Sequence, residues 1–177
     1  MKRKKRQVVG FIFTVLFGTL LHFVYKWSGG SPLVGAFSAV NESVWEHLKL
    51  IVVPMLLFGA YEYLNYGRKQ RNFIPIRVLS ILLGITIIVT VFYTYTGIFG
   101  SNCTLVDILL FLVAAFAAYR LSAKMLRTEQ FSSEGARVFA VIGLLILITC
   151  FALFTFNPPH INLFRDPTTG LFGASTK

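Results

Sequence analysis

Five long apolar stretches constrain the fold of this chain more than any other feature of its sequence. Each is about as long as the roughly 20 residues that a helix needs to cross a bilayer. Hydrophobic residues make up 55% of the chain and charged residues only 14%, whereas a soluble domain carries about 25% charged residues. The sequence therefore predicts a single all-α transmembrane domain over residues 1–177, and it excludes a soluble enzyme or a nucleic-acid-binding domain. The predicted spans are residues 8–27, 48–66, 75–99, 105–121 and 138–156.

Basic residues gather in three clusters beside these spans, and they predict the orientation. The net charge is +10, and the clusters lie at residues 2–6, 68–77 and 120–137. Five spans place all three clusters on one side, and cytoplasmic loops carry the excess of Lys and Arg. We therefore expect a multi-pass plasma-membrane protein with its N-terminus inside and its C-terminus outside. The first apolar stretch is too long for a typical signal peptide, so we expect it to remain as a span.

Most of the histidines and acidic residues fall near the predicted outer face. Ionisable groups at membrane depth are costly and by default mark a functional site. Here they come from the end of the first span, the start of the second and the tail after the fifth. They comprise all three histidines and four of the seven acids, namely His22, His47, His160, Glu42, Glu46, Asp107 and Asp166.

A metal site is the sharpest hypothesis for this group. Glu46 and His47 are adjacent, so on a helix they point about 100° apart and do not share one ion. Glu46 with His22 and His160 is the more plausible ligand set, and zinc fits these ligand types best. Glu42 is then the expected general base, with His47 as acid or supporting group.

Such a site at the membrane interface predicts a metal-dependent hydrolase or transferase that acts on a lipid or lipid-linked substrate. Two basic side chains on the same side, Lys49 and Arg165, are candidates for holding a phosphate or carboxylate headgroup. The alternative interpretations are a small transporter or ion-coupled binding protein, and a non-catalytic subunit that docks a partner. The sequence leaves enzymatic activity and oligomeric state open.

Structural roles compete for the same residues. Ser43 and Glu46 fit a capping box at a helix start. Ser43 and His47 share a helix face, which also permits a metal-free nucleophile and base. Near the cytoplasmic side, Glu62 is expected to extend to the interface or to pair with Arg77.

The segment after the fifth span has the composition of an ordered tail. Pro158 and Pro159 end the span, and Asp166 before a proline predicts a turn. Residues 157–177 are therefore expected to pack over the outer face. Cys103 and Cys150 have neither metal-site spacing nor the pattern of a disulfide framework.

The run Asn41-Glu42-Ser43-Val44-Trp45-Glu46-His47-Leu48-Lys49, together with residues 21–29 and the segment from Pro158 to Gly170, carries a family resemblance. With these motifs, the chain resembles an uncharacterised family of small bacterial polytopic integral membrane proteins. The resemblance covers essentially the whole chain. It implies a bacterial plasma-membrane protein, and it implies no activity, substrate or cofactor.

Overall fold

The computed structural model describes residues 3–174, which form six α-helices and no strand. Residues 1–2, which include Lys2 of the first basic cluster, lie outside the described residues, and so do the last three residues of the predicted tail (175–177). The helices are α1 (Arg3–Trp27), α2 (Pro32–Gly35), α3 (Val44–Asn65), α4 (Phe73–Phe99), α5 (Thr104–Met125) and α6 (Glu134–Phe156). Two 3-10 turns, η1 (Gly67–Lys69) and η2 (Asn162–Phe164), complete the chain.

Five of these helices are long and apolar enough to cross a membrane, and they coincide with the five predicted spans. The predicted all-helical fold class is therefore confirmed. The helices extend beyond the apolar stretches, since α3 starts at Val44 rather than 48 and α5 continues to Met125 rather than 121. Backbone hydrogen bonding carries a helix into its polar ends, whereas hydropathy marks only the apolar part.

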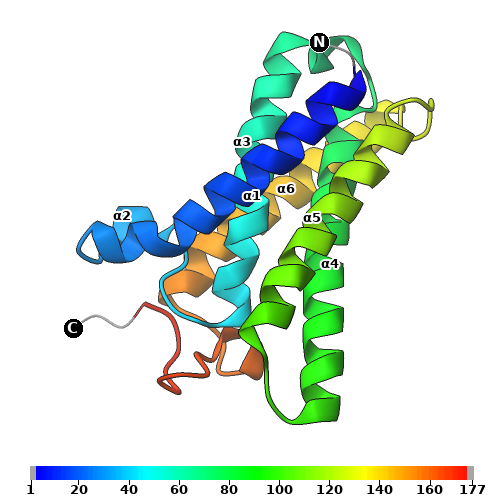
Figure 1. Ribbon diagram of the computed structural model, residues 1–177. Helices are drawn as coiled ribbons and strands as arrows, with labels where there is room; N and C mark the ends of the chain where they lie inside the picture. The colour runs from blue at the N-terminus through cyan, green and yellow to red at the C-terminus, as the bar shows by residue number, and fades with distance from the viewer. Residues whose placement is uncertain (1–2, 175–177) are drawn as a thin grey trace.

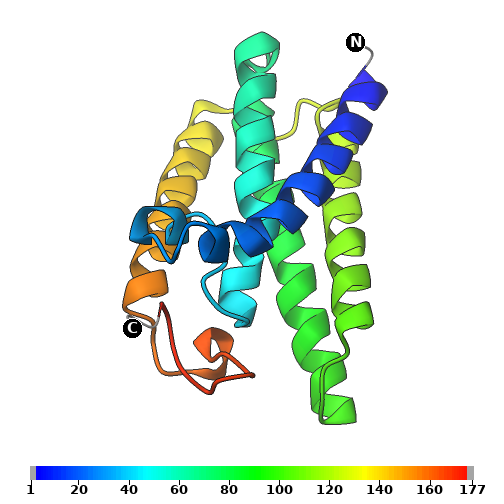
Figure 2. The same cartoon turned by 60° about the vertical axis from the view of Figure 1, so that its left-hand side comes forward.

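The helices pack around α3 and α4 (Figure 1). α1 packs on α3 and α5, while α4 packs on α3, α5 and α6. Seen from the side, α5 and α6 flank α3 and α4, and α1 crosses the bundle at a steep tilt (Figure 2). Because α6 touches few other elements, most of its side chains are exposed.

The core lies along the inner face of α3. Leu48, Ile51 and Met55 of α3 are almost fully buried, and they belong to one apolar cluster with Ala114 and Ala118 of α5. Small side chains allow helices to approach closely in a membrane, where apolar association has no solvent driving force.

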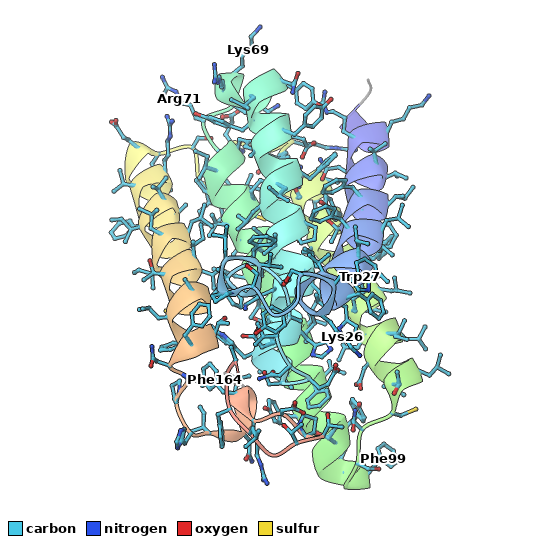
Figure 3. The ribbon with its side chains drawn as sticks, turned by 90° about the vertical axis from the view of Figure 1, so that its left-hand side faces the viewer. Lys26, Trp27, Lys69, Arg71, Phe99 and Phe164 are labelled. Carbon is cyan, nitrogen blue, oxygen red and sulfur yellow. The ribbon has the colours of Figure 1, made fainter. Side chains whose placement is uncertain are left out.

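The bundle has two chemically different ends (Figure 3). One end carries the start of α1, η1 and the loop between α5 and α6, with basic side chains such as Lys69 and Arg71. We call it the basic end. The other, which we call the far end, carries the start of α3, the turn between α4 and α5, and the tail with Phe164, whereas α2 lies about halfway along the bundle (Figure 2).

Candidate functional site

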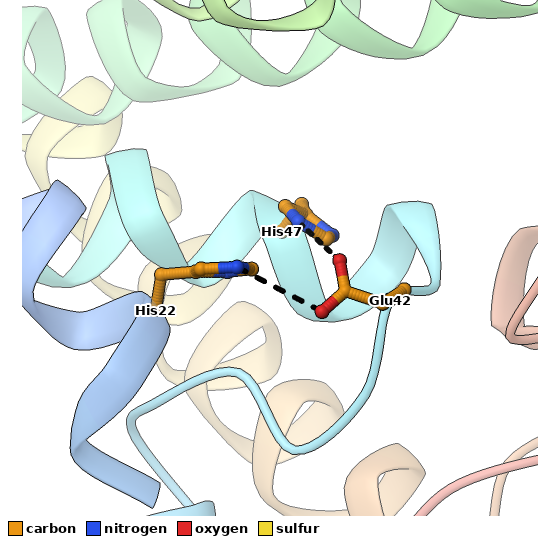
Figure 4. Close-up of side chains that lie close together, drawn as sticks. All are labelled: His22, Glu42 and His47. Atoms are coloured by element: carbon orange, nitrogen blue, oxygen red, sulfur yellow. Dashed lines mark ion pairs between the residues drawn. The ribbon is translucent and has the colours of Figure 1, made fainter. Parts of the chain in front are cut away.

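Three titratable side chains from separate segments converge between the end of α1 and the start of α3 (Figure 4). Glu42 Oε1 lies 3.7 Å from His22 Nε2, and Glu42 Oε2 lies 3.4 Å from His47 Nε2. One ligand atom from each of the three residues lies within 4.8 Å of the other two. The side chains are partly accessible, at 29% for His22, 50% for Glu42 and 34% for His47. We call these three residues the His–Glu cluster.

Local structure explains how the cluster forms. His22 lies in the last turns of α1, His47 lies in the first turn of α3, and Glu42 precedes the α3 N-cap, Ser43. The Ser43 hydroxyl accepts a hydrogen bond from the Glu46 N–H at 3.4 Å, as expected for a helix start. His47 Nδ1 lies 2.9 Å from the Ser43 carbonyl oxygen. Because a carbonyl only accepts, Nδ1 is the donor in this bond, and Nε2 is the ring nitrogen that faces Glu42.

The three residues are of types that can bind a divalent metal ion, and they lie close enough together to hold one. Two ligands about 2.05 Å from a tetrahedral ion lie about 3.3 Å apart, close to the two separations observed here. His47 Nδ1 also bonds a backbone carbonyl, and metal-binding imidazoles commonly make a bond of this kind. Two histidines and one carboxylate leave a fourth position for water or substrate.

A second polar cluster is buried behind the first. Lys49 is 0% exposed and Glu46 is 1% exposed, and their charged atoms lie 2.6 Å apart. Lys49 Nζ also donates to the carbonyl oxygens of Gly35 (2.8 Å) and Ser38 (3.2 Å) and contacts Thr155 Oγ1 of α6 (2.5 Å). Four acceptors thus surround an ammonium group that has three N–H bonds.

The structure therefore separates residues that the sequence grouped together. Glu46 is committed to Lys49 rather than placed with His22, because a buried cation lies one turn along its own helix. All three N–H bonds of Lys49 find acceptors within the protein, whereas the sequence assigned this side chain to a substrate headgroup. Glu42, predicted as the general base, instead lies between the two imidazoles of His22 and His47.

The other two predicted site residues lie in the tail. His160 stacks on Phe172 at a ring-centroid distance of 4.7 Å, and no described contact joins it to the His–Glu cluster. Arg165 is exposed, with its backbone bridged to Phe172. The tail itself folds back onto the bundle, since the Phe164 ring lies 4.9 Å from the Trp45 ring.

The turn predicted at Asp166 is present in the tail. Asp166 Oδ1 accepts hydrogen bonds from the N–H and hydroxyl of Thr168, both at 2.7 Å, and from the N–H of Thr169 at 3.3 Å. Burial raises the pKa of the Asp166 carboxyl, but these hydrogen bonds outweigh burial and hold the pKa below its usual value.

Toward the basic end, Glu62 and Arg77 form an ion pair, which confirms the second of the two roles expected for Glu62. Both side chains are buried, and Gln7 Nε2 donates to Glu62 Oε1 at 3.3 Å. The Arg77 guanidinium also lies over the rings of Phe73 and Tyr119, at 5.4 and 5.5 Å. This pair joins α3 to α4 and leaves little free space around it.

Sequence reasoning did not identify Thr155 as a partner of the buried pair. The three-residue spacing of Glu46 and Lys49 is a usable signal for an ion pair on one helix. A threonine within an apolar span, 106 positions away from Lys49, has no such signal.

Comparison with known proteins agrees with the resemblance seen in the motifs. A model for a family of unknown function, DUF6512, matches residues 1–174. The chain therefore belongs to this family. No curated protein and no solved structure matches it.

Proposed function

We propose that this protein is a membrane-embedded, metal-dependent hydrolase or transferase whose metal ligands are His22, Glu42 and His47. The observation that carries the proposal is the convergence of one ligand atom from each of these residues within 4.8 Å. These residues come from the end of α1, the segment before α3 and the first turn of α3. Convergence of costly polar groups from separate segments favours a functional site.

Zinc fits this site best. Imidazole and carboxylate suit zinc, and three protein ligands with one open position are typical of catalytic zinc. Zinc lowers the pKa of a bound water to about 7 and polarises a carbonyl or phosphoryl oxygen. The protein's part is to hold the ligands, and the bond from His47 to the Ser43 carbonyl supports that role.

A lipid or lipid-linked substrate suits the surroundings of the cluster. The neighbouring apolar side chains Phe23, Trp27 and Leu33 are 45%, 67% and 78% exposed. Aromatic residues of this kind settle at membrane interfaces. Lys26 is exposed and lies one turn after His22 on the same face of α1, where it suits an anionic headgroup.

We further propose that the basic end faces the cytoplasm of a bacterial cell. The described basic side chains cluster there, and this bias sets orientation in plasma membranes. The N-terminus is then inside, the C-terminus is outside, and the His–Glu cluster is reached from the outer leaflet. Labelling of single cysteines placed at the two ends, with a membrane-impermeant reagent on intact cells, tests this orientation.

The metal content of the purified protein is the first test of function. We expect close to one zinc per chain after purification in detergent, and its loss in His22→Ala, Glu42→Gln and His47→Ala. His160→Ala is the matched control, because this histidine stacks on Phe172 and should keep the metal. Metal-free wild-type protein after zinc supplementation, or metal retained in all three variants, would refute the site.

Activity is tested next in proteoliposomes that contain phospholipids. Release of a headgroup or acyl chain by the zinc-loaded wild type, but not by Glu42→Gln, is the expected result. If the protein binds zinc but releases no product from a lipid or lipid-linked phosphate, the metal site stands and the proposed enzymatic activity is refuted.

A further inference from the structure

The buried pair Glu46–Lys49 contacts Thr155 of α6 and is hydrogen-bonded to the backbone that precedes Glu42. We propose that these three residues act as positioning residues, which hold Glu42 in place as a ligand. This inference rests on the proposed metal site and adds to it a clamp formed by α6 and the tail.

The first link runs from the pair to the backbone before Glu42. Lys49 Nζ donates to the carbonyl oxygens of Gly35 and Ser38, and Glu46 Oε2 accepts the Val40 N–H at 3.1 Å. Residues 35–40 are thus bonded to buried charges near both ends. Since Glu42 lies two positions later, before the helix begins, the placement of its carboxylate depends on this backbone.

The second link runs through α6 and the tail. Thr155 Oγ1 contacts Lys49 Nζ at 2.5 Å and lies 3.0 Å from Glu46 Oε1. The Thr155 carbonyl oxygen accepts the N–H of Ala174, and the Gly173 carbonyl accepts the Asn41 side-chain amide at 3.0 Å. Thr155 is therefore linked to the chain before Glu42 in two ways: through the buried pair, and through the tail to Asn41.

Stability alone is a poor explanation for this cluster. A buried ion pair is often no more stabilising than an apolar pair of the same volume, because removing charges from water is costly. The pair instead fixes geometry, because each buried N–H and each carboxylate oxygen must hydrogen-bond to a partner in a defined direction. Such outer support is a recognised requirement of metal sites, where its loss lowers metal affinity by about 10–100-fold.

The test compares two buried threonines in the full-length protein in detergent. Thr155→Val removes the hydroxyl with almost no change in shape. Thr14→Val is the matched control, because Thr14 is equally buried and its hydroxyl bonds Tyr119 away from the cluster. Zinc affinity is measured by competition with a chromophoric chelator, and deuterium uptake is measured in a peptide covering residues 36–43.

We expect Thr155→Val to lower zinc affinity by about tenfold or more and to increase exchange in residues 36–43. Thr155→Ser keeps the hydroxyl and should show the zinc affinity and exchange of the wild type. Thr14→Val should change neither zinc affinity nor exchange in residues 36–43. A chain that ends at Phe172 keeps every buried charge but loses the bonds of Gly173 and Ala174, so it should weaken zinc binding even if Thr155→Val does not fold.

The outcomes separate the two proposals. Wild-type protein that binds no zinc refutes the metal site and the clamp with it. Zinc binding that is unchanged in both Thr155→Val and the shortened chain keeps the metal site and overturns the positioning role. An equal loss in Thr14→Val also overturns that role, because the effect is then general destabilisation.

Discussion

At Gly18 of α1, one turn before His22, the backbone of α3 leaves no room for a side chain. A Cβ added there falls far inside van der Waals distance of the Leu50 carbonyl oxygen and 3.1 Å from Phe111 Cζ. Neither helix relieves the first clash by rotating a side chain, because the atom in the way belongs to the backbone. Gly18→Ala must therefore push α1 away from α3.

The size of the effect follows from two opposing contributions. Forcing a methyl group into a packed interface costs about 1–3 kcal/mol, and alanine recovers up to about 1 kcal/mol of helix propensity over glycine. Gly143 of α6 has nothing within 4 Å of an added Cβ, so Gly143→Ala carries only the favourable contribution. The propensity gain is common to both variants and cancels, so they should differ by about 1–3 kcal/mol, or roughly 5- to 160-fold in the unfolding equilibrium.

Reversible unfolding in mixed micelles of mild detergent and dodecyl sulfate measures this difference. Gly18→Ala should unfold at a lower fraction of dodecyl sulfate than the wild type, and Gly143→Ala at an equal or higher one. His22 lies one turn after Gly18, so the displaced helix should also weaken zinc binding in Gly18→Ala alone. If the two variants unfold together, the close approach of α1 and α3 is not as described.

Two further predictions concern buried charges. Glu62→Gln leaves Arg77 without its counter-charge in the bundle and should lower the free energy of unfolding by about 3–5 kcal/mol. Adding Arg77→Met should recover much of this loss, and the same micelle titration of both variants measures the difference. The folded-state pKa of Asp166 lies below its unfolded value of about 3.9, so its carboxylate stabilises the docked tail above that pH and loses this effect as pH falls through the lowered value. Trp45 fluorescence in a Trp27→Phe background should therefore change at acidic pH and shift its midpoint in Asp166→Asn, and an identical titration of both proteins contradicts the role of this carboxyl.

The fold was predictable because the length and apolar composition of a stretch are enough to identify a membrane-spanning helix. A stretch such as residues 138–156 has almost no polar side chain, and only a helix satisfies its backbone in lipid. Pairing of Glu62 with Arg77 was also predictable, since a buried charge near a membrane requires a partner. Packing order was not, because α6 contacts mainly α4 and no pattern in its sequence indicates that neighbour.

The site was predictable by region and not by partner. Sidedness selected His22, Glu42, Glu46 and His47 as candidates, and the structure brings His22, Glu42 and His47 together. Sidedness also grouped Glu46 with His22, whereas Glu46 pairs with Lys49. Deciding between the two glutamates depends on where Lys49 points, which the packing of α6 and the loop around it determines. His160 shared the predicted side, but local stacking on Phe172 occupies its ring instead.

Two buried ion pairs, Glu46–Lys49 and Glu62–Arg77, both involve α3, and their positions near its two ends affect how α3 is held in the bundle. Lys49 lies near the far-end start of α3 and bonds α6 through Thr155, whereas Glu62 lies near the opposite end and bonds α4 through Arg77. Apolar faces do not distinguish one register from another in lipid, because lipid tails solvate a leucine as well as another helix does. A slip of one turn moves α3 by about 5.4 Å, which breaks the Glu62–Arg77 pair and the Lys49–Thr155 bond while preserving much of the apolar contact. The charges therefore fix the depth of α3 in the bundle, and with it the depth of His47 and Glu42 relative to His22.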